Sequence, residues 1–140
     1  MQFEYSIDIN AAPERVWGVM TDVERWPEWT ASMSEVRLVE GDRLAVGARA
    51  RVRQPKLSAS TLEVTELEPG RGFTWQAASP GVSFVGKHEI APARAGVTVT
   101  LSVQFSGPLA GIAGLFTSGM TRRYVKMEAE GLKRRSEGAG

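Results

Sequence analysis

The only histidine of the chain, His88, lies in an alternating segment whose apolar members are Val82, Phe84 and Ile90. Successive side chains of a strand point to opposite faces of a sheet, so the alternation predicts that His88 shares the apolar face. Burial there would lower the pKa of the imidazole and keep the ring neutral. A neutral imidazole can exchange a hydrogen bond or a proton with a ligand, but a lone histidine on such a face is more often a core residue. Both interpretations stay open.

Tyr124 is the second candidate for proton chemistry. It belongs to a stripe of apolar residues at spacings of three or four, as on one face of a helix: Leu109, Ile112, Phe116, Met120, Tyr124 and Met127. Such a tyrosine is either a core residue whose hydroxyl reaches solvent or backbone, or a polar group inside an apolar pocket. Met120, on the same stripe, would suit a pocket of variable content because methionine adapts to irregular spaces.

The four tryptophans indicate large aromatic surfaces used for packing or for a pocket. On a helical turn Trp26 and Trp29 would face the same way, and they would either close one end of the core or form a wall of a cavity. The predicted ligand-binding residues are Trp26, Trp29, Val52, Leu57, Trp75, Phe84, His88, Phe116, Met120 and Tyr124. No catalytic residue is assigned, and His88 and Tyr124 are the candidates if the protein is an enzyme.

Several kinds of site are excluded by composition. The chain has no cysteine, so disulfides and thiolate chemistry are absent, and one histidine without cysteine cannot build a common transition-metal site. No phosphate-binding loop, dinucleotide fingerprint or G-x-S-x-G motif is present, so we expect no cofactor. With 17 basic and 16 acidic residues the net charge is +1, which does not favour nucleic acid as a partner.

Short alternating stretches separated by turns that contain glycine or proline predict a meander of strands. The expected elements are a strand over 3–9, a helix from Pro13, a short helical or turn segment over 22–29, strands near 36–38, 48–53, 61–67, 73–77, 82–90 and 97–105, and a helix from 109 to about 135. Connections this short favour antiparallel pairing. Within 48–53, Arg49, Arg51 and Arg53 occupy one face, which is typical of a solvated face paired with acids such as Glu63.

A long helix with one apolar stripe can cover the apolar face of such a sheet, and 140 residues suit one domain of this kind. Because a sheet twists and curls while a helix stays straight, we predict a cavity between the two, closed at one end by the two short helices. Protein interiors normally fill such space with side chains, so the cavity is a hypothesis at this point.

The segment IDINAAPERVWGVMTDVERWPEW resembles the START-like, or SRPBCC, superfamily, which includes polyketide cyclase/dehydrase-like proteins, plant hormone receptors and lipid carriers. The matching residues are Ile9, Ala12, Pro13, Val16, Trp17, Asp22, Trp26 and Trp29. The segments VTELEPGRGFTW and VTVTLSVQFSGPL are similar to central and last strands of that superfamily. The resemblance implies an α+β helix-grip (START-like) fold, in which a curved antiparallel sheet of six to seven strands wraps around a long C-terminal helix, with two short helices after the first strand. It also implies a single domain over 1–137, followed by a frayed tail, 138–140.

By the same resemblance, the loops 54–57 and 79–81 are candidate gates over a ligand, although plain hairpin turns are the simpler interpretation, above all for the second. Gly111, Gly114 and Gly119 each weaken the first half of the long helix by about 1 kcal/mol relative to alanine. We therefore expect this half to move when a ligand is admitted.

The leading hypothesis is binding or transport of a hydrophobic small molecule, such as a lipid, aromatic or polyketide-like compound. An alternative is an enzyme of cyclase, aromatase or dehydratase type, which holds a polyketide chain folded while His88 or Tyr124 moves a proton. A third is a protein-interaction module, which an outward apolar patch beside the arginine row would support. We expect a monomer or weak homodimer without a membrane span and, because the first residues do not resemble a signal peptide, a cytoplasmic location.

Overall fold

A computed structural model describes residues 2–39, 41–57 and 59–138, with side chains throughout except at residues 79 and 111–118. Its seven strands form one sheet in the order β1-β7-β6-β5-β4-β3-β2, and every pair of neighbours is antiparallel. The strands are β1 (Gln2–Ile9), β2 (Glu35–Leu38), β3 (Arg49–Arg53), β4 (Ser60–Glu68), β5 (Gly72–Ser79), β6 (Val82–Ala93) and β7 (Gly96–Ser106). The predicted antiparallel meander is confirmed. The predicted tail lies outside the described residues from Ala139 onward.

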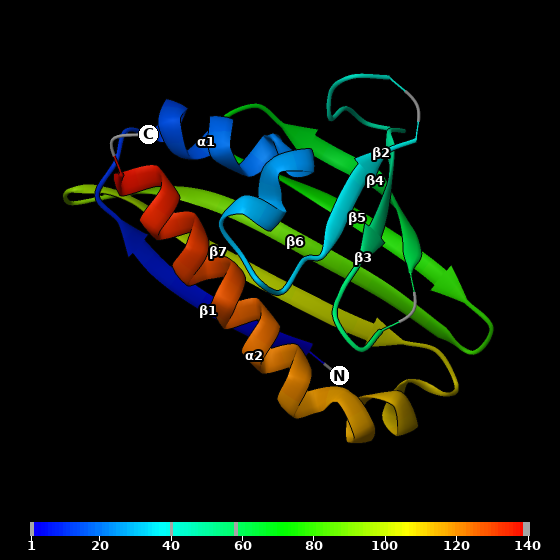
Figure 1. Ribbon diagram of the computed structural model, residues 1–140. Coiled ribbons are helices and arrows are strands. Elements are labelled where there is room, and N and C mark those ends of the chain that lie inside the picture. Colours follow the sequence, from blue (N-terminus) through cyan, green and yellow to red (C-terminus); the bar gives the residue numbers. More distant parts are fainter. Residues whose placement is uncertain (1, 40, 58, 139–140) are drawn as a thin grey trace.

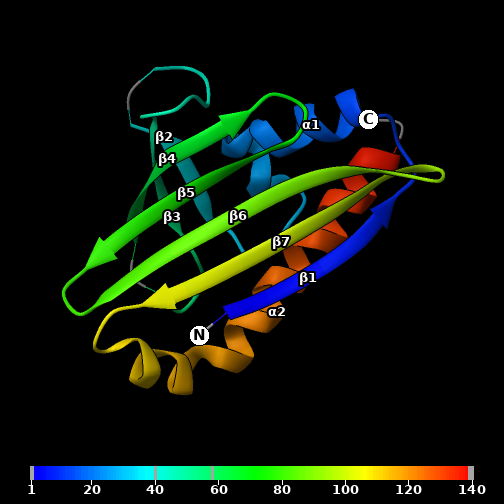
Figure 2. The same cartoon turned by 180° about the vertical axis from the view of Figure 1, so that it is seen from behind.

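Three helices accompany the sheet: α1 (Pro13–Thr21), the 3-10 helix η1 (Val23–Glu28) and α2 (Ala110–Glu137). Figure 1 shows α2 running along one face of the curved sheet, with α1 beside its C-terminal end. Seen from behind in Figure 2, the strands β5, β6, β7 and β1 lie in front of the helices, so the long helix covers one face only. This arrangement is the helix-grip architecture that the sequence predicts.

Local sequence explains where these elements begin and turn. Pro13 occupies the first helical position of α1, where its missing N–H is not needed. Gly70 follows Pro69 in the turn between β4 and β5 and has a φ of 77°, a conformation that glycine adopts without strain. The row of Arg49, Arg51 and Arg53 is exposed along β3, and Arg49 lies opposite Glu63 of β4, as expected for a solvated face.

Trp26 lies at the centre of the buried core, with 1 % of its surface exposed. Its ring centroid lies 5.5 Å from that of Trp29, 5.3 Å from that of Trp75 and 6.4 Å from that of Phe73. Its indole N–H donates to the carbonyl oxygen of Met20 at 3.0 Å. This aromatic cluster fills the end of the fold at which α1 and η1 meet the sheet.

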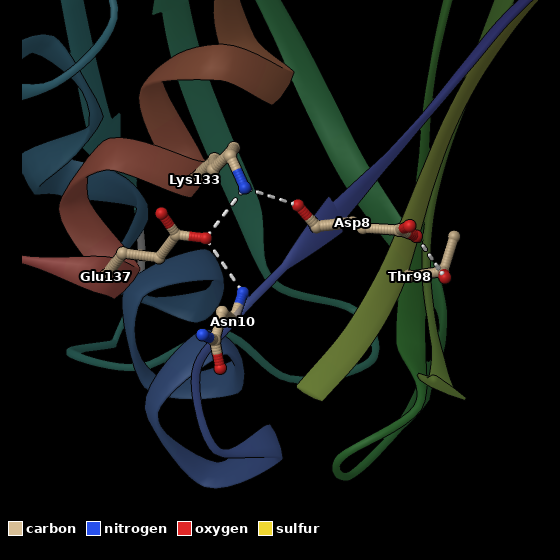
Figure 3. A network of polar contacts seen from close by, with 5 residues as sticks. All are labelled: Asp8, Asn10, Thr98, Lys133 and Glu137. Atoms are coloured by element: carbon tan, nitrogen blue, oxygen red, sulfur yellow. Dashed lines mark hydrogen bonds and ion pairs between the residues drawn. The ribbon is translucent and has the colours of Figure 1, made fainter. Parts of the chain in front are cut away.

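The C-terminal part of α2 is tied to the sheet by a polar network drawn in Figure 3. Lys133 Nζ donates to the backbone oxygen of Asp8 and to Glu137 Oε2, both at 2.7 Å. The backbone N–H of Asn10 donates to the same Glu137 oxygen at 2.8 Å, and the Thr98 hydroxyl donates to Asp8 Oδ1 at 2.6 Å. The hydrogen bonds from Lys133 first, and then Asn10, hold the pKa of Glu137 below its usual value.

A second set of contacts ties the same end of the helix to α1 and η1. The Arg15 guanidinium donates to the carbonyl oxygen of Arg135 at 2.8 Å, and the Arg135 side chain pairs with Glu28 at 2.8 Å. Gly131 of α2 lies so close to Trp29 that a Cβ at this position would collide with the Trp29 carbonyl oxygen. The last turns of α2 are therefore fixed from two sides.

Among the described residues, none of the helices combines the length and the hydropathy that a membrane span requires.

Candidate functional site

A cavity of about 630 Å³ lies between the sheet and α2. The helix contributes Met120, Thr121, Tyr124, Val125 and Glu128 to its wall. The strands and loops contribute mainly apolar residues, among them Met33, Val52, Leu57, Leu62, Trp75, Ala77, Val82, Phe84, Leu101, Val103 and Phe105. His88 and Gly86 of β6 also line the cavity. The space between curved sheet and helix is thus partly open, as the shapes of these elements predict.

Seven of the ten residues predicted to bind a ligand lie on this wall: Val52, Leu57, Trp75, Phe84, His88, Met120 and Tyr124. Trp26 and Trp29 do not line the cavity. They pack in the core behind Trp75 and under α2, which is the first of the two alternatives given for them above. The side chain of Phe116 lies outside the described residues. Whether the seven bind a ligand stays a prediction.

His88 stands among aromatic rings and is 5 % exposed. Its ring stacks on that of Phe73 at 4.2 Å between centroids and meets the ring of Trp75 edge-on at 5.5 Å. Its Nδ1 lies 3.4 Å from the backbone oxygen of Phe73. Because a carbonyl oxygen only accepts hydrogen bonds, Nδ1 carries the proton, and in the neutral ring Nε2 is then an acceptor.

Glu128 reaches from α2 toward that acceptor, with 3.6 Å between its Oε2 and the Nε2 of His88. Burial lowers the pKa of His88 to about 4, although the hydrogen bond to Phe73 opposes this shift. Burial raises the pKa of Glu128 to about 8. At neutral pH the site therefore holds a protonated carboxylic acid facing a neutral imidazole, since removing both groups from water disfavours their charged forms.

Glu128 is not among the residues predicted from the sequence. Its spacing contained a signal, because Met120, Tyr124 and Glu128 are successive members of an i, i+4, i+8 series on one helix face. The predicted apolar stripe ends instead at Met127, which does not line the cavity. A carboxyl group on the same face as two predicted wall residues was the feature to follow.

Tyr124 connects the helix to the β3–β4 loop. Its hydroxyl donates to the backbone oxygen of Pro55 at 2.7 Å, so the proton of this hydroxyl is already engaged. In the same loop Gln54 and Leu57 line the cavity, and Lys56 has a left-handed φ of 66°. This loop, one of the two candidate gates, is thus held against α2 by the hydrogen bond from Tyr124.

The turn between β5 and β6 is held differently. The backbone N–H of Leu109, just before α2, donates to the carbonyl oxygen of Gly81 at 2.8 Å. The side chain of Leu109 lies so close to Gly81 that a Cβ there would clash with it. A gating role for either loop, and movement of the first half of α2, stay predictions.

Among the residues that the structure describes, no three His, Cys, Asp or Glu side chains come together as a metal site. The cavity has a mainly apolar wall. On this wall, Glu128 is a proton donor, His88 is a proton acceptor, and the Tyr124 hydroxyl lies beside the β3–β4 loop. These groups can orient an uncharged ligand by hydrogen bonds or move a proton on it.

Comparisons with known proteins agree with this architecture. A family model described as polyketide cyclase/dehydrase and lipid transport matches residues 1–137. A solved structure from Thermus thermophilus is similar with a TM-score of 0.80 and 16 % identity, covering 97 % of both chains. The ZhuI aromatase/cyclase from Streptomyces sp. R1128 is similar with a TM-score of 0.81 and 16 % identity, covering 98 % of this chain and 93 % of that one. A comparison with curated proteins found no significant match.

Proposed function

The chain belongs to the polyketide cyclase/dehydrase and lipid transport family, and from that membership we propose that it binds a mainly apolar small molecule in the cavity under α2. The observation that supports the proposal is the cavity of about 630 Å³ between the sheet and α2, a volume within the usual range for small-molecule sites. Aromatic and aliphatic side chains form most of its wall. Affinity would come from the removal of apolar surface from water, at roughly 25 cal/mol per Å².

The few polar groups on the wall would orient the ligand. Glu128 offers an O–H donor and His88 an acceptor; His88 is buried in the sheet, and 13 % of the Glu128 side chain is exposed. A hydrogen bond in such a site discriminates strongly between ligands, because a ligand that fails to make it leaves a buried polar group unpaired. We therefore expect a ligand that is apolar over most of its surface and carries an oxygen at one end.

Native mass spectrometry of the freshly purified protein tests this proposal. The expected result is a population with added mass, and organic extraction should release a compound of that mass. Ala77→Phe, which fills the cavity from β5, should lose the adduct. Ala91→Phe is the matched control, because Ala91 is exposed on β6 and outside the cavity, and it should keep the adduct. An adduct that survives Ala77→Phe, or the absence of binding for any apolar compound offered, contradicts the proposal.

A second candidate function is proton-transfer catalysis of the cyclase or dehydratase type, and the pairing of Glu128 with His88 is the observation that favours it. In a dehydration, His88 Nε2 would take the proton from the carbon next to a ketone, while the Glu128 carboxylic acid would protonate the hydroxyl that leaves as water. A carbon–carbon double bond forms, one carbon–oxygen bond breaks, and the proton then returns from the imidazolium to the carboxylate. Such a step requires surroundings that keep the acid protonated and the base neutral at the working pH.

Recovery of the bound compound separates the two functions. A binder returns the compound unchanged, whereas the enzyme returns a product that has lost water or gained a ring. With a product in hand, Glu128→Gln and His88→Gln should each abolish its formation while the substrate still binds. Turnover that survives both changes would exclude the pair from the chemistry.

A further inference from the structure

Two buried tryptophans, Trp26 of η1 and Trp75 of β5, differ in how their indole N–H groups are used. The N–H of Trp26 donates to the Met20 carbonyl oxygen at 3.0 Å. Trp75 is equally well buried, at 2 % exposure, but within the described part of the chain its N–H has no hydrogen-bond acceptor. Buried tryptophan N–H groups usually find a partner, so the unused donor of Trp75 requires an explanation.

The unused N–H borders the cavity. Trp75 and Gly86 both line the cavity, and a Cβ placed on Gly86 would lie 3.1 Å from the indole nitrogen. Because Gly86 has no side chain, the nitrogen edge of the indole is left uncovered at this point. Within the described residues, the one fully enclosed side-chain polar atom without a partner is Ser136 Oγ, so the Trp75 nitrogen is not sealed inside the protein.

We propose that the Trp75 N–H is a specificity-determining donor of the cavity, and that the ligand carries a carbonyl oxygen, as in an aromatic ketone, which accepts this hydrogen bond. The inference rests on the proposed binding function and adds the chemical class of the ligand. A carbonyl oxygen accepts two hydrogen bonds, so a single ketone can also be reached by a second donor.

The charges around the cavity favour an uncharged acceptor over a carboxylate. Among the described residues that line the cavity, Lys87 is the single cationic side chain, and it is exposed. A buried anion without a paired cation is strongly disfavoured, whereas a neutral carbonyl that finds a donor is not. A ketone therefore fits the position beside Trp75 better than an acid does.

The test compares 9-fluorenone with fluorene, which has a similar ring system but no carbonyl oxygen. Dissociation constants of both probes are measured for the wild type and for Trp75→Phe, which keeps an aromatic ring and removes the N–H. Loss of one neutral hydrogen bond should weaken fluorenone binding about three- to tenfold and leave fluorene binding unchanged or stronger. Trp17→Phe, at a half-buried tryptophan that does not line the cavity, is the control and should change neither constant.

A second readout needs no variant. The protein has four indole N–H groups, and in a nitrogen–proton correlation spectrum the Trp75 signal should move downfield with fluorenone but not with fluorene. The Trp26 signal is the internal reference, because its N–H is already bonded to Met20. The inference is wrong, and the binding function stands, if both probes bind and shift the Trp75 signal alike. The same holds if the ratio of the two dissociation constants is unchanged in Trp75→Phe. If neither probe nor any other apolar compound binds, the proposed function itself fails.

Discussion

The carboxyl group of Glu128 faces the Nε2 atom of His88 across 3.6 Å, and each group is uncharged for the same reason, its removal from water. The distance is longer than a good hydrogen bond, so the two groups are neighbours with room to adjust rather than a tight ion pair. The backbone carbonyl of Phe73 fixes the ring from its other side. A ligand oxygen that approaches this pair meets a donor and an acceptor that are both available.

The protonation of His88 can be observed directly, because it is the only histidine in the chain. Nitrogen-15 spectra of the imidazole at pH 7 should show a neutral ring with the proton on Nδ1, since that atom faces the Phe73 carbonyl. On acidification the ring should stay neutral until the pH approaches the lowered pKa of about 4. A proton on Nε2, or an imidazolium at pH 7, would contradict this arrangement.

Glu128→Gln should remove a pH-dependent destabilisation. The folded pKa of Glu128 is raised from 4.5 to about 8, so the wild type is most favoured below pH 4.5 and loses stability as the pH rises toward 8. The neutral amide has no such loss. The difference in unfolding free energy between Glu128→Gln and the wild type should therefore shift in favour of the variant by roughly 3–5 kcal/mol from pH 4.5 to pH 8. Urea unfolding of both proteins from pH 4.5 to 8 measures the difference. The other titratable groups on the cavity wall, His88, Tyr124 and Lys87, are present in both proteins. A difference in unfolding free energy that does not change with pH would contradict the raised pKa of Glu128.

Tyr124→Phe should loosen the β3–β4 loop without emptying the cavity. The change removes the hydrogen bond from the hydroxyl to the Pro55 oxygen and keeps the ring on the wall. We expect a stability loss of about 1 kcal/mol and faster release of fluorene in stopped-flow displacement. An unchanged release rate together with the stability loss would show that the bond holds the loop but does not limit ligand exchange.

Gly131→Ala should be far more damaging than the same change at Gly119 in the same helix. A Cβ at position 131 would collide with the backbone of Trp29, and relief requires the helix or η1 to shift, at a cost of about 1–3 kcal/mol. Around Gly119 no atom of the described residues lies within 4 Å of the added atom, so alanine should stabilise the helix by about 1 kcal/mol. Thermal unfolding of the two variants gives the comparison. Equal effects would mean that the contact between α2 and η1 does not fix the helix.

The sequence predicted the elements well because each of them has a local cause. Alternation over 3–9 and 97–105 corresponds to β1 and β7, and a period of three to four residues corresponds to α2. Pro13 and Pro69-Gly70 act through their own backbone restrictions, which need no knowledge of the rest of the chain. The helix-grip arrangement then follows from one apolar stripe that covers one apolar face.

The site was harder to predict because it depends on how α2 is rotated about its axis. Hydrophobicity favoured Met127 as an inward residue, yet the wall of a cavity is not packed solid, and the polar Glu128 lies on it. Trp26 and Trp29 illustrate the opposite case, since their size and spacing suit a wall and a core equally. Their placement behind Trp75 is a tertiary property that a single sequence does not encode locally.

The most direct test of the binding account is a titration of the methyl-labelled protein with fluorene, followed in carbon–proton spectra. Saturable shifts are expected at Val52, Leu101 and Val103, which line the cavity. Val39 and Val46, which are 52 % and 63 % exposed and lie outside it, should not move. Shifts confined to those surface valines, or no saturable shift at the cavity residues, would contradict the account.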